Sequence, residues 1–202
     1  ARAAATHGSE GPIFCYFGMI YPGKGLSLLL DVLKGLKNQG VHFRFKFIGG
    51  GMPGAEGLEK DLQREIVTKG LEDRVEHLGL IAAEEASSWI QASRFVFLPY
   101  DSGLSDRRGS FMAAIAHGKA VVTTPPAVEM AFLRNGVNVV WPEKTSVEDY
   151  LPILQRLLRD DGLVAKLEKG AQELSLQFRW EKIAGDHELV LHQRNRTSRC
   201  AI

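Results

Sequence analysis

The sequence has few cysteines, almost no net charge and no long apolar run, and each absence excludes a class of protein. Its two cysteines, Cys15 and Cys200, lie near opposite ends of the 202 residues. We therefore expect no structural disulfide, and a reducing, cytoplasmic setting. No stretch of 18 apolar residues exists, which predicts no transmembrane segment. The first residues lack the apolar core of a signal peptide. A net charge of +1 argues against a nucleic-acid binder.

The six histidines are scattered without metal-ligand spacing, so the sequence predicts no metal site and no cofactor. His117 is expected to be a helix-end histidine rather than a catalyst. The composition, 45% hydrophobic and 24% charged, is typical of a globular domain. We expect a single domain over residues 12–193, with flexible tails at 1–11 and 194–202. Because the first residue is Ala rather than Met, we expect the chain to be part of a longer protein.

Short apolar runs alternate with longer segments of helical period, which predicts an α/β domain with a parallel sheet. Strands are expected at residues 13–17, 43–48, 75–78, 94–99, 120–123 and 138–141. Helices are expected at 24–39, 56–69, 83–91, 110–117, 147–160, 163–176 and 180–193. Six such strands predict a doubly wound, Rossmann-like sheet in the order 3-2-1-4-5-6. Trp89, Trp141 and Trp180 are expected to be packing residues.

Ligands of such sheets bind beyond the carboxyl ends of the strands, so the first two loops are candidates. The first begins at Gly18 and brings Lys24 to the start of a long helix, where free N–H groups favour an anion. The alternative is a solvated lysine. The second loop is Gly49, Gly50 and Gly51, which lack side chains and permit close approach of a ligand. An ordinary tight turn is its alternative.

The third loop, Gly79, Leu80 and Ile81, offers backbone and apolar surface. Such a surface suits a flat nucleotide base, and plain packing explains it equally well. The sequence at this point leaves both interpretations open.

The fourth loop carries two adjacent arginines, Arg107 and Arg108, directly before a helix. Charge, backbone N–H groups and a hydroxyl meet there, as a phosphate group requires. The expected binding residues beside the arginines are Ser105, Asp106, Gly109 and Ser110. In the alternative interpretation the arginines pair with Asp101 and Asp106, and Ser110 is only a helix N-cap.

Six segments, in this order and spacing, resemble a known family. They are GMIYPGKGL (18–26), FKFIGGG (45–51), VEHLGLI (75–81), RFVFLPY (94–100), AAIAHGKAVVTT (113–124) and FRWEKIA (178–184). Together they are similar to the C-terminal, nucleotide-sugar-binding domain of the retaining group 1, or family four, glycosyltransferases. The resemblance covers about residues 12–193 and implies one half of a two-domain GT-B fold.

The resemblance implies a UDP-, GDP- or ADP-sugar donor, no required metal, and transfer of a hexosyl group with retention. It also implies an acceptor site on a missing N-terminal domain, so the isolated domain is expected to be inactive. Lys24 matches one member of the family's basic pair, but Met19 stands where the arginine is usual. Ser105 and Ala113 stand where the family has two glutamates.

We therefore expect Lys24, Arg107 and Arg108 to stabilise the leaving diphosphate, with Asp101 or Asp106 as a substitute carboxylate. Two other functions are compatible with the same sequence. One is a non-catalytic binding or scaffold module that kept the fold. The other is a sugar-nucleotide epimerase, which binds a similar ligand without an acceptor.

Overall fold

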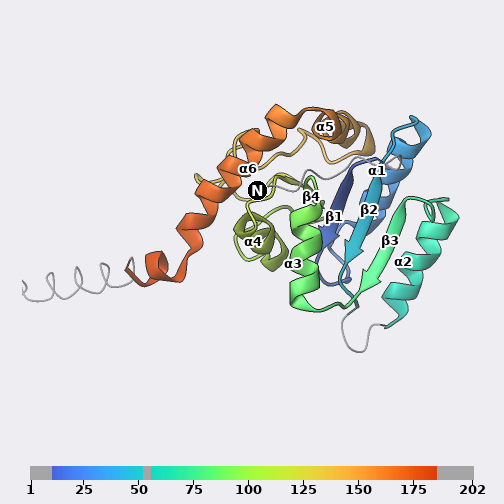
Figure 1. Cartoon of the computed structure of the whole chain (residues 1–202), viewed down its shortest axis with the longest axis horizontal. Helices are drawn as coiled ribbons and strands as arrows, with labels where there is room; N and C mark the ends of the chain where they lie inside the picture. Colours follow the sequence, from blue (N-terminus) through green and yellow to red (C-terminus); the bar gives the residue numbers. More distant parts are fainter. Residues whose placement is uncertain (1–10, 52–55, 186–202) are drawn as a thin grey trace, which may run out of the picture.

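The computed structural model describes residues 11–51 and 56–185, which form a parallel sheet covered by helices on both faces (Figure 1). The strands are β1 (Ile13–Phe17), β2 (Arg44–Ile48), β3 (Val75–Gly79), β4 (Val96–Leu98) and β5 (Val121–Thr123). The helices are α1 (Leu26–Asn38), α2 (Glu56–Thr68), α3 (Ala83–Ala92), α4 (Gly109–Ala116), α5 (Val147–Arg159) and α6 (Asp161–Ser175), followed by the 3-10 turn η1 (Leu176–Phe178).

The sheet is entirely parallel and its order is β3-β2-β1-β4-β5. The two central strands β1 and β4 carry no charged residue, because both of their faces are covered. The chain builds the sheet outward from β1 to β3, then returns to add β4 and β5 on the other side of β1. The order therefore reverses between β1 and β4, the position at which doubly wound sheets bind ligands.

Helices cover the two faces in two groups. Leu29, Leu30, Leu33 and Leu36 recur at three- and four-residue steps along α1, and all four are fully buried. α1 contacts α2 and α5, α4 contacts α6, and α5 also contacts α6. Right-handed crossovers require α1 and α2 on one face and α3 and α4 on the other. Because all five strands are parallel, their carboxyl ends lie at the same edge of the sheet.

The predicted sixth strand is wrong. Residues 138–141 lie beside β5 but make only a single bridge to it, in which Val140 accepts from Thr123 N (2.9 Å) and donates to Val121 O (3.0 Å). The segment bonds to its own turn instead. The Asn138 side chain bonds to Arg134 N and Phe132 O. Asparagine turn chemistry therefore competes with the sheet for this backbone.

The other predicted elements are confirmed, with ends that differ by at most two residues. Of the predicted helix 180–193, residues 180–185 are helical and the remainder lies outside the described residues, as do most of both predicted tails. Trp180 is 81% exposed, so its prediction as a packing residue is wrong. Figure 1 shows α6 leading away from the sheet toward this end of the chain. Among the described residues, no helix has the length and apolarity needed to cross a membrane.

Cys15 is fully buried in β1 and is not part of a disulfide, while Cys200 lies outside the described residues. Burial raises the pKa of the Cys15 thiol to about 12, because the thiolate cannot be solvated there. The protonated thiol is therefore a packing group in the centre of the sheet.

Candidate anion site at the carboxyl edge of the sheet

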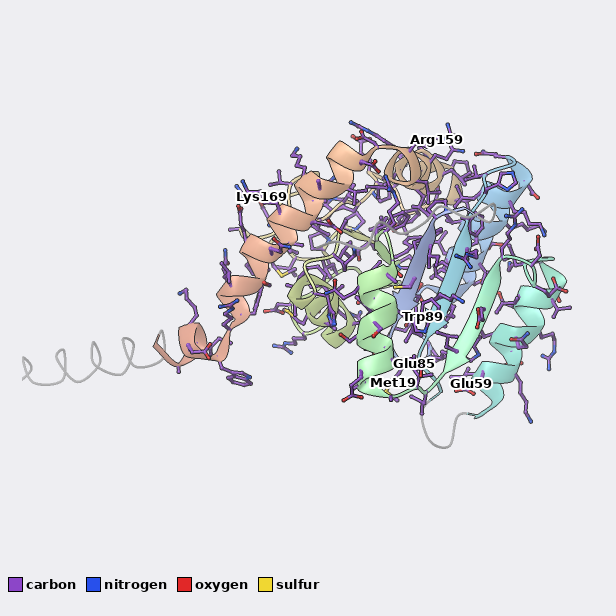
Figure 2. All side chains as sticks on the ribbon, viewed as in Figure 1. Met19, Glu59, Glu85, Trp89, Arg159 and Lys169 are labelled. Atoms are coloured by element: carbon purple, nitrogen blue, oxygen red, sulfur yellow. The ribbon has the colours of Figure 1, made fainter. Side chains whose placement is uncertain are left out.

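The loops after the first four strands converge at one edge of the sheet and are joined by backbone hydrogen bonds. Gly18 N donates to Ile48 O (2.9 Å), Gly49 N to Gly79 O (3.0 Å), and Asp101 N to Gly23 O (3.2 Å). Figure 2 shows Met19 and Glu59 at the lower end of the sheet, toward which the strand arrows point. The predicted grouping of these loops is thus confirmed.

The glycines of the second loop allow it to pack closely against the neighbouring loops. A Cβ on Gly49 would lie 2.0 Å from Gly18 O, and one on Gly50 would lie 2.8 Å from Leu80 Cγ. Gly51 N donates to the carboxylate of Glu59 on α2, so this amide already has an acceptor. Glu59 was not anticipated from the sequence, because only folding brings the first turn of α2 against this loop.

Lys24 is the most unusual residue of the edge, since it is a cation only 6% exposed. Its Nζ lies 4.6 Å from the ring centroid of Tyr21 and 5.4 Å from that of Tyr100. Within residues 11–51 and 56–185, no carboxylate pairs with it and no acceptor takes its hydrogens. A buried ammonium group without a counter-charge is costly, and a bound anion would remove that cost.

Arg108 is the N-cap residue of α4 and approaches the same tyrosine from the fourth loop. Its guanidinium carbon lies 4.5 Å from the centroid of the Tyr100 ring, and its Nη2 donates to Ser102 Oγ (2.6 Å). In the described part of the chain, neither Arg108 nor the exposed Arg107 pairs with Asp101 or Asp106. The alternative interpretation, in which the arginines pair with the aspartates of their own loop, is therefore wrong.

Tyr100 joins these groups and was not identified as a site residue from the sequence. It is fully buried, and its hydroxyl is 2.8 Å from Ser110 Oγ in the first turn of α4. Burial raises the pKa of this phenol to about 12, so the ring stays neutral at physiological pH. The Ser110 hydroxyl thus faces Tyr100, while the N-termini of α1 and α4 have no side-chain cap.

The remaining candidate residues divide between the rim and the interior. Leu80 is 77% exposed beside the half-buried Ile81, which leaves an apolar surface after β3. Gly109 and Asp106 are exposed at the start of α4. His117 is structural: its ring nitrogens bond to Ser87 Oγ (2.8 Å) and Ala113 O (2.7 Å) at the end of α4. No group of three metal-ligating side chains occurs among the described residues.

Two hollows open near these loops, one beside Lys24 and the other beside Arg108. One, of about 160 Å³, lies between α1 and α2 and is lined by Lys24, Tyr21 and Asp101 together with leucines of both helices. The other, of about 440 Å³, lies between the fourth loop and the loop after β5. Its polar wall includes Ser105 and Asp106, and its apolar wall includes Val128 and Met130.

Residues 11–160 match the family described as glycosyl transferases group 1. The chain belongs to the group 1 glycosyltransferase family. It is 27% identical over 170 residues to an uncharacterized glycosyltransferase of Methanocaldococcus jannaschii, which covers 83% of this chain and 44% of that protein. It is also 27% identical over 210 residues to a D-inositol 3-phosphate glycosyltransferase of Jonesia denitrificans, covering 98% of this chain and 46% of that protein. The chain thus spans about half the length of these curated relatives.

Solved group 1 and related structures share the fold. The Anabaena protein HepE, in complex with UDP and glucose, has a TM-score of 0.72 at 21% identity over 92% of this chain and 49% of its own. Sucrose-phosphate synthase from Thermosynechococcus elongatus has a TM-score of 0.77 at 20% identity, covering 94% and 47%. The C-terminal domain of a group 1 protein from Francisella tularensis has a TM-score of 0.68 at 21% identity, covering 82% and 85%.

This group 1 glycosyltransferase domain therefore has the fold expected from the resemblance, with five strands rather than six. Ser105 is half-buried on the fourth loop, and Ala113 is half-buried on α4. Met19 is 40% exposed at the end of β1 and has no charge to contribute. The cations of this edge thus come from Lys24 and from the arginines of the fourth loop.

Proposed function

We propose that this domain binds the diphosphate of a nucleotide-diphosphate sugar and supports transfer of its sugar to an acceptor with retention of configuration. The observation that carries the proposal is the buried, unpaired Lys24 at the topological switch point, with Arg108 beside it on the same tyrosine ring. No carboxylate of the described residues forms an ion pair with Lys24, although Asp101 lines the same hollow, and a diphosphate would supply that direct counter-charge. Membership of the glycosyltransferase family makes the leaving group of sugar transfer the natural source of that diphosphate.

The chemistry follows from charge that develops as the glycosidic bond to the diphosphate breaks. Lys24, Arg107 and Arg108 stabilise that charge, and a site that is ordered beforehand needs little reorganisation at the moment of reaction. Backbone N–H groups at the uncapped starts of α1 and α4, including those of Gly109 and Ser110, add donors along the helix dipoles.

The other subsites follow from the same edge. The first two loops pack closely because they contain glycines, and together they form the bottom of the site; these glycines are Gly18, Gly49, Gly50 and Gly51. Gly79, Leu80 and Ile81 offer the apolar surface on which a UDP, GDP or ADP base rests. Ser105 and Asp106 line the hollow next to Arg108 and contact the sugar hydroxyls, so that Asp106 substitutes for the family's carboxylate.

The acceptor site belongs to a second, N-terminal domain in this proposal, so the 202-residue chain alone binds donor without turnover. The support is that the chain spans about half of its curated relatives, and that it covers 85% of a solved Francisella chain that is a C-terminal domain. The UDP and glucose bound to the structurally similar HepE support a nucleotide-sugar ligand.

An Arg108→Ala variant should bind its nucleoside diphosphate more weakly than the wild type by about 1–3 kcal/mol, the cost of one charge-assisted partner. Calorimetric titration of the two proteins measures the difference. Arg159→Ala is the control, because Arg159 ends α5 on another part of the surface (Figure 2) and should leave the affinity unchanged. Equal affinities of Arg108→Ala and wild type would contradict the assignment of Arg108.

The absent family glutamates, replaced by Ser105 and Ala113, favour one competing function, a binding or scaffold module without catalysis. A product assay on the domain joined to its N-terminal half separates the possibilities. Retaining transfer gives a new glycoside with the anomeric configuration of the donor. An epimerase gives an altered sugar nucleotide and no glycoside, and a scaffold leaves the donor intact.

A further inference from the structure

Tyr100 is a fully buried residue at the point where β4 opens into the fourth loop. Its hydroxyl is bonded to Ser110 Oγ at 2.8 Å. The tyrosine therefore ties the end of β4 to the first turn of α4. This connection fixes the position and tilt of the aromatic ring.

The fixed ring carries two cations that arrive from separate loops. Lys24 Nζ, from the loop after β1, lies 5.4 Å from the ring centroid, and the guanidinium carbon of Arg108 lies 4.5 Å from it. Both distances are within the range of a cation–π interaction. The two positive side chains repel each other, and the negative face of the aromatic ring offsets part of that repulsion.

Whether a buried lysine can still bind an anion depends on whether its partner is a carboxylate or an aromatic ring. A carboxylate would neutralise a cation and occupy its N–H groups, as Glu168 does for the almost equally buried Lys119. An aromatic face attracts the charge but takes no hydrogen bond from it. The ring thus holds Lys24 in position while leaving its three N–H donors available to an incoming anion.

We propose that Tyr100 is the positioning residue of the anion site, which orients Lys24 and Arg108 through its ring before a diphosphate binds. The inference rests on the proposed function, because it assumes that a diphosphate is the ligand. Arg107 is exposed and contacts no aromatic ring within the described ranges, so its contribution does not depend on Tyr100.

The test titrates inorganic pyrophosphate, without metal, into the 202-residue chain and its variants by calorimetry. Tyr100→Leu should bind pyrophosphate about tenfold more weakly, while Tyr100→Phe, which keeps the ring, should stay within about threefold of the wild type. Tyr150→Leu is the matched control. Tyr150 is also fully buried and hydrogen-bonded, to Thr123 O and Thr124 Oγ1, but no cation of the described residues lies over its ring. Its affinity for pyrophosphate should equal that of the wild type.

A second variant keeps the test decisive if Tyr100→Leu does not fold. Replacing Tyr100 by pentafluorophenylalanine keeps the ring shape but reverses its electrostatic face, so pyrophosphate should bind about tenfold more weakly than to Tyr100→Phe. Equal affinities of these two ring variants, or wild-type affinity in a folded Tyr100→Leu, overturn the role of Tyr100. If the wild type binds neither pyrophosphate nor any nucleoside diphosphate, the proposed function fails as well.

Discussion

Replacing Lys24 by Met should remove most of the affinity for a nucleoside diphosphate without lowering the stability of the fold. Lys24 is 6% exposed and has no counter-charge among the described residues, so its ammonium group is a cost in the free protein. Loss of its charge-assisted hydrogen bonds to the ligand should weaken binding roughly 10- to 150-fold. Methionine has a similar length and fills the same apolar surroundings. Calorimetry and chemical denaturation measure the two effects.

Lys119 provides the matched control for this prediction. It is 8% exposed, but its Nζ lies 2.7 Å from Glu168 Oε1, and it precedes β5 at the opposite edge of the sheet. Lys119→Met should therefore cost about 3 kcal/mol of stability and leave nucleotide affinity unchanged. If Lys24→Met destabilises the chain as Lys119→Met does and binds nucleotide like the wild type, Lys24 is a structural lysine.

Replacing Gly25 by Ala should lower the free energy of unfolding by more than about 4 kcal/mol, because the mutation combines a strained backbone with a backbone clash. Gly25 has a φ of +65° at the N-cap of α1. An added Cβ would lie 1.5 Å from Pro99 O, which cannot move without shifting the loop after β4. The same shift would separate Lys24 from Tyr100, so diphosphate binding should fall too. Chemical denaturation gives the change in stability.

Gly70→Ala separates the clash from the strain. Gly70 has the same φ of +65°, but a Cβ there would meet nothing within 4 Å. It should therefore cost only about 1–2 kcal/mol, the penalty of a left-handed alanine. Similar losses in Gly25→Ala and Gly70→Ala would mean that the first and fourth loops are not packed as closely as the structure indicates.

Most of the fold could be predicted from hydrophobic periodicity, because its signals are local. The leucines of α1 and the apolar run of β1 each determine an element from consecutive residues. Residues 138–141 misled the prediction, since an apolar run there reads as a strand. The Asn138 side chain forms competing hydrogen bonds with Arg134 N and Phe132 O. These bonds depend on the folded turn, so the sequence pattern does not predict them.

The site was predictable only in part, for the same reason. Lys24 and Arg108 stand out in sequence as cations next to helix starts. Their common contact, Tyr100, lies directly after the predicted strand at 94–99, and only the β1–β4 neighbourhood brings Lys24 against it. Nor does the sequence reveal that Lys24 lacks a counter-charge. Asp101 and Asp106 are close in the chain to the two arginines, so the sequence also suggests ion pairs that the fold does not form. The absence of those pairs is a property of the folded loops.

The central claim is that the carboxyl edge of this domain holds a nucleoside diphosphate at Lys24 and Arg108. The most direct measurement is a calorimetric titration of the chain with UDP, GDP and ADP, each with and without magnesium. We expect saturable binding of at least one of them that does not require magnesium and competes with pyrophosphate. A folded chain that binds none of the three would contradict it.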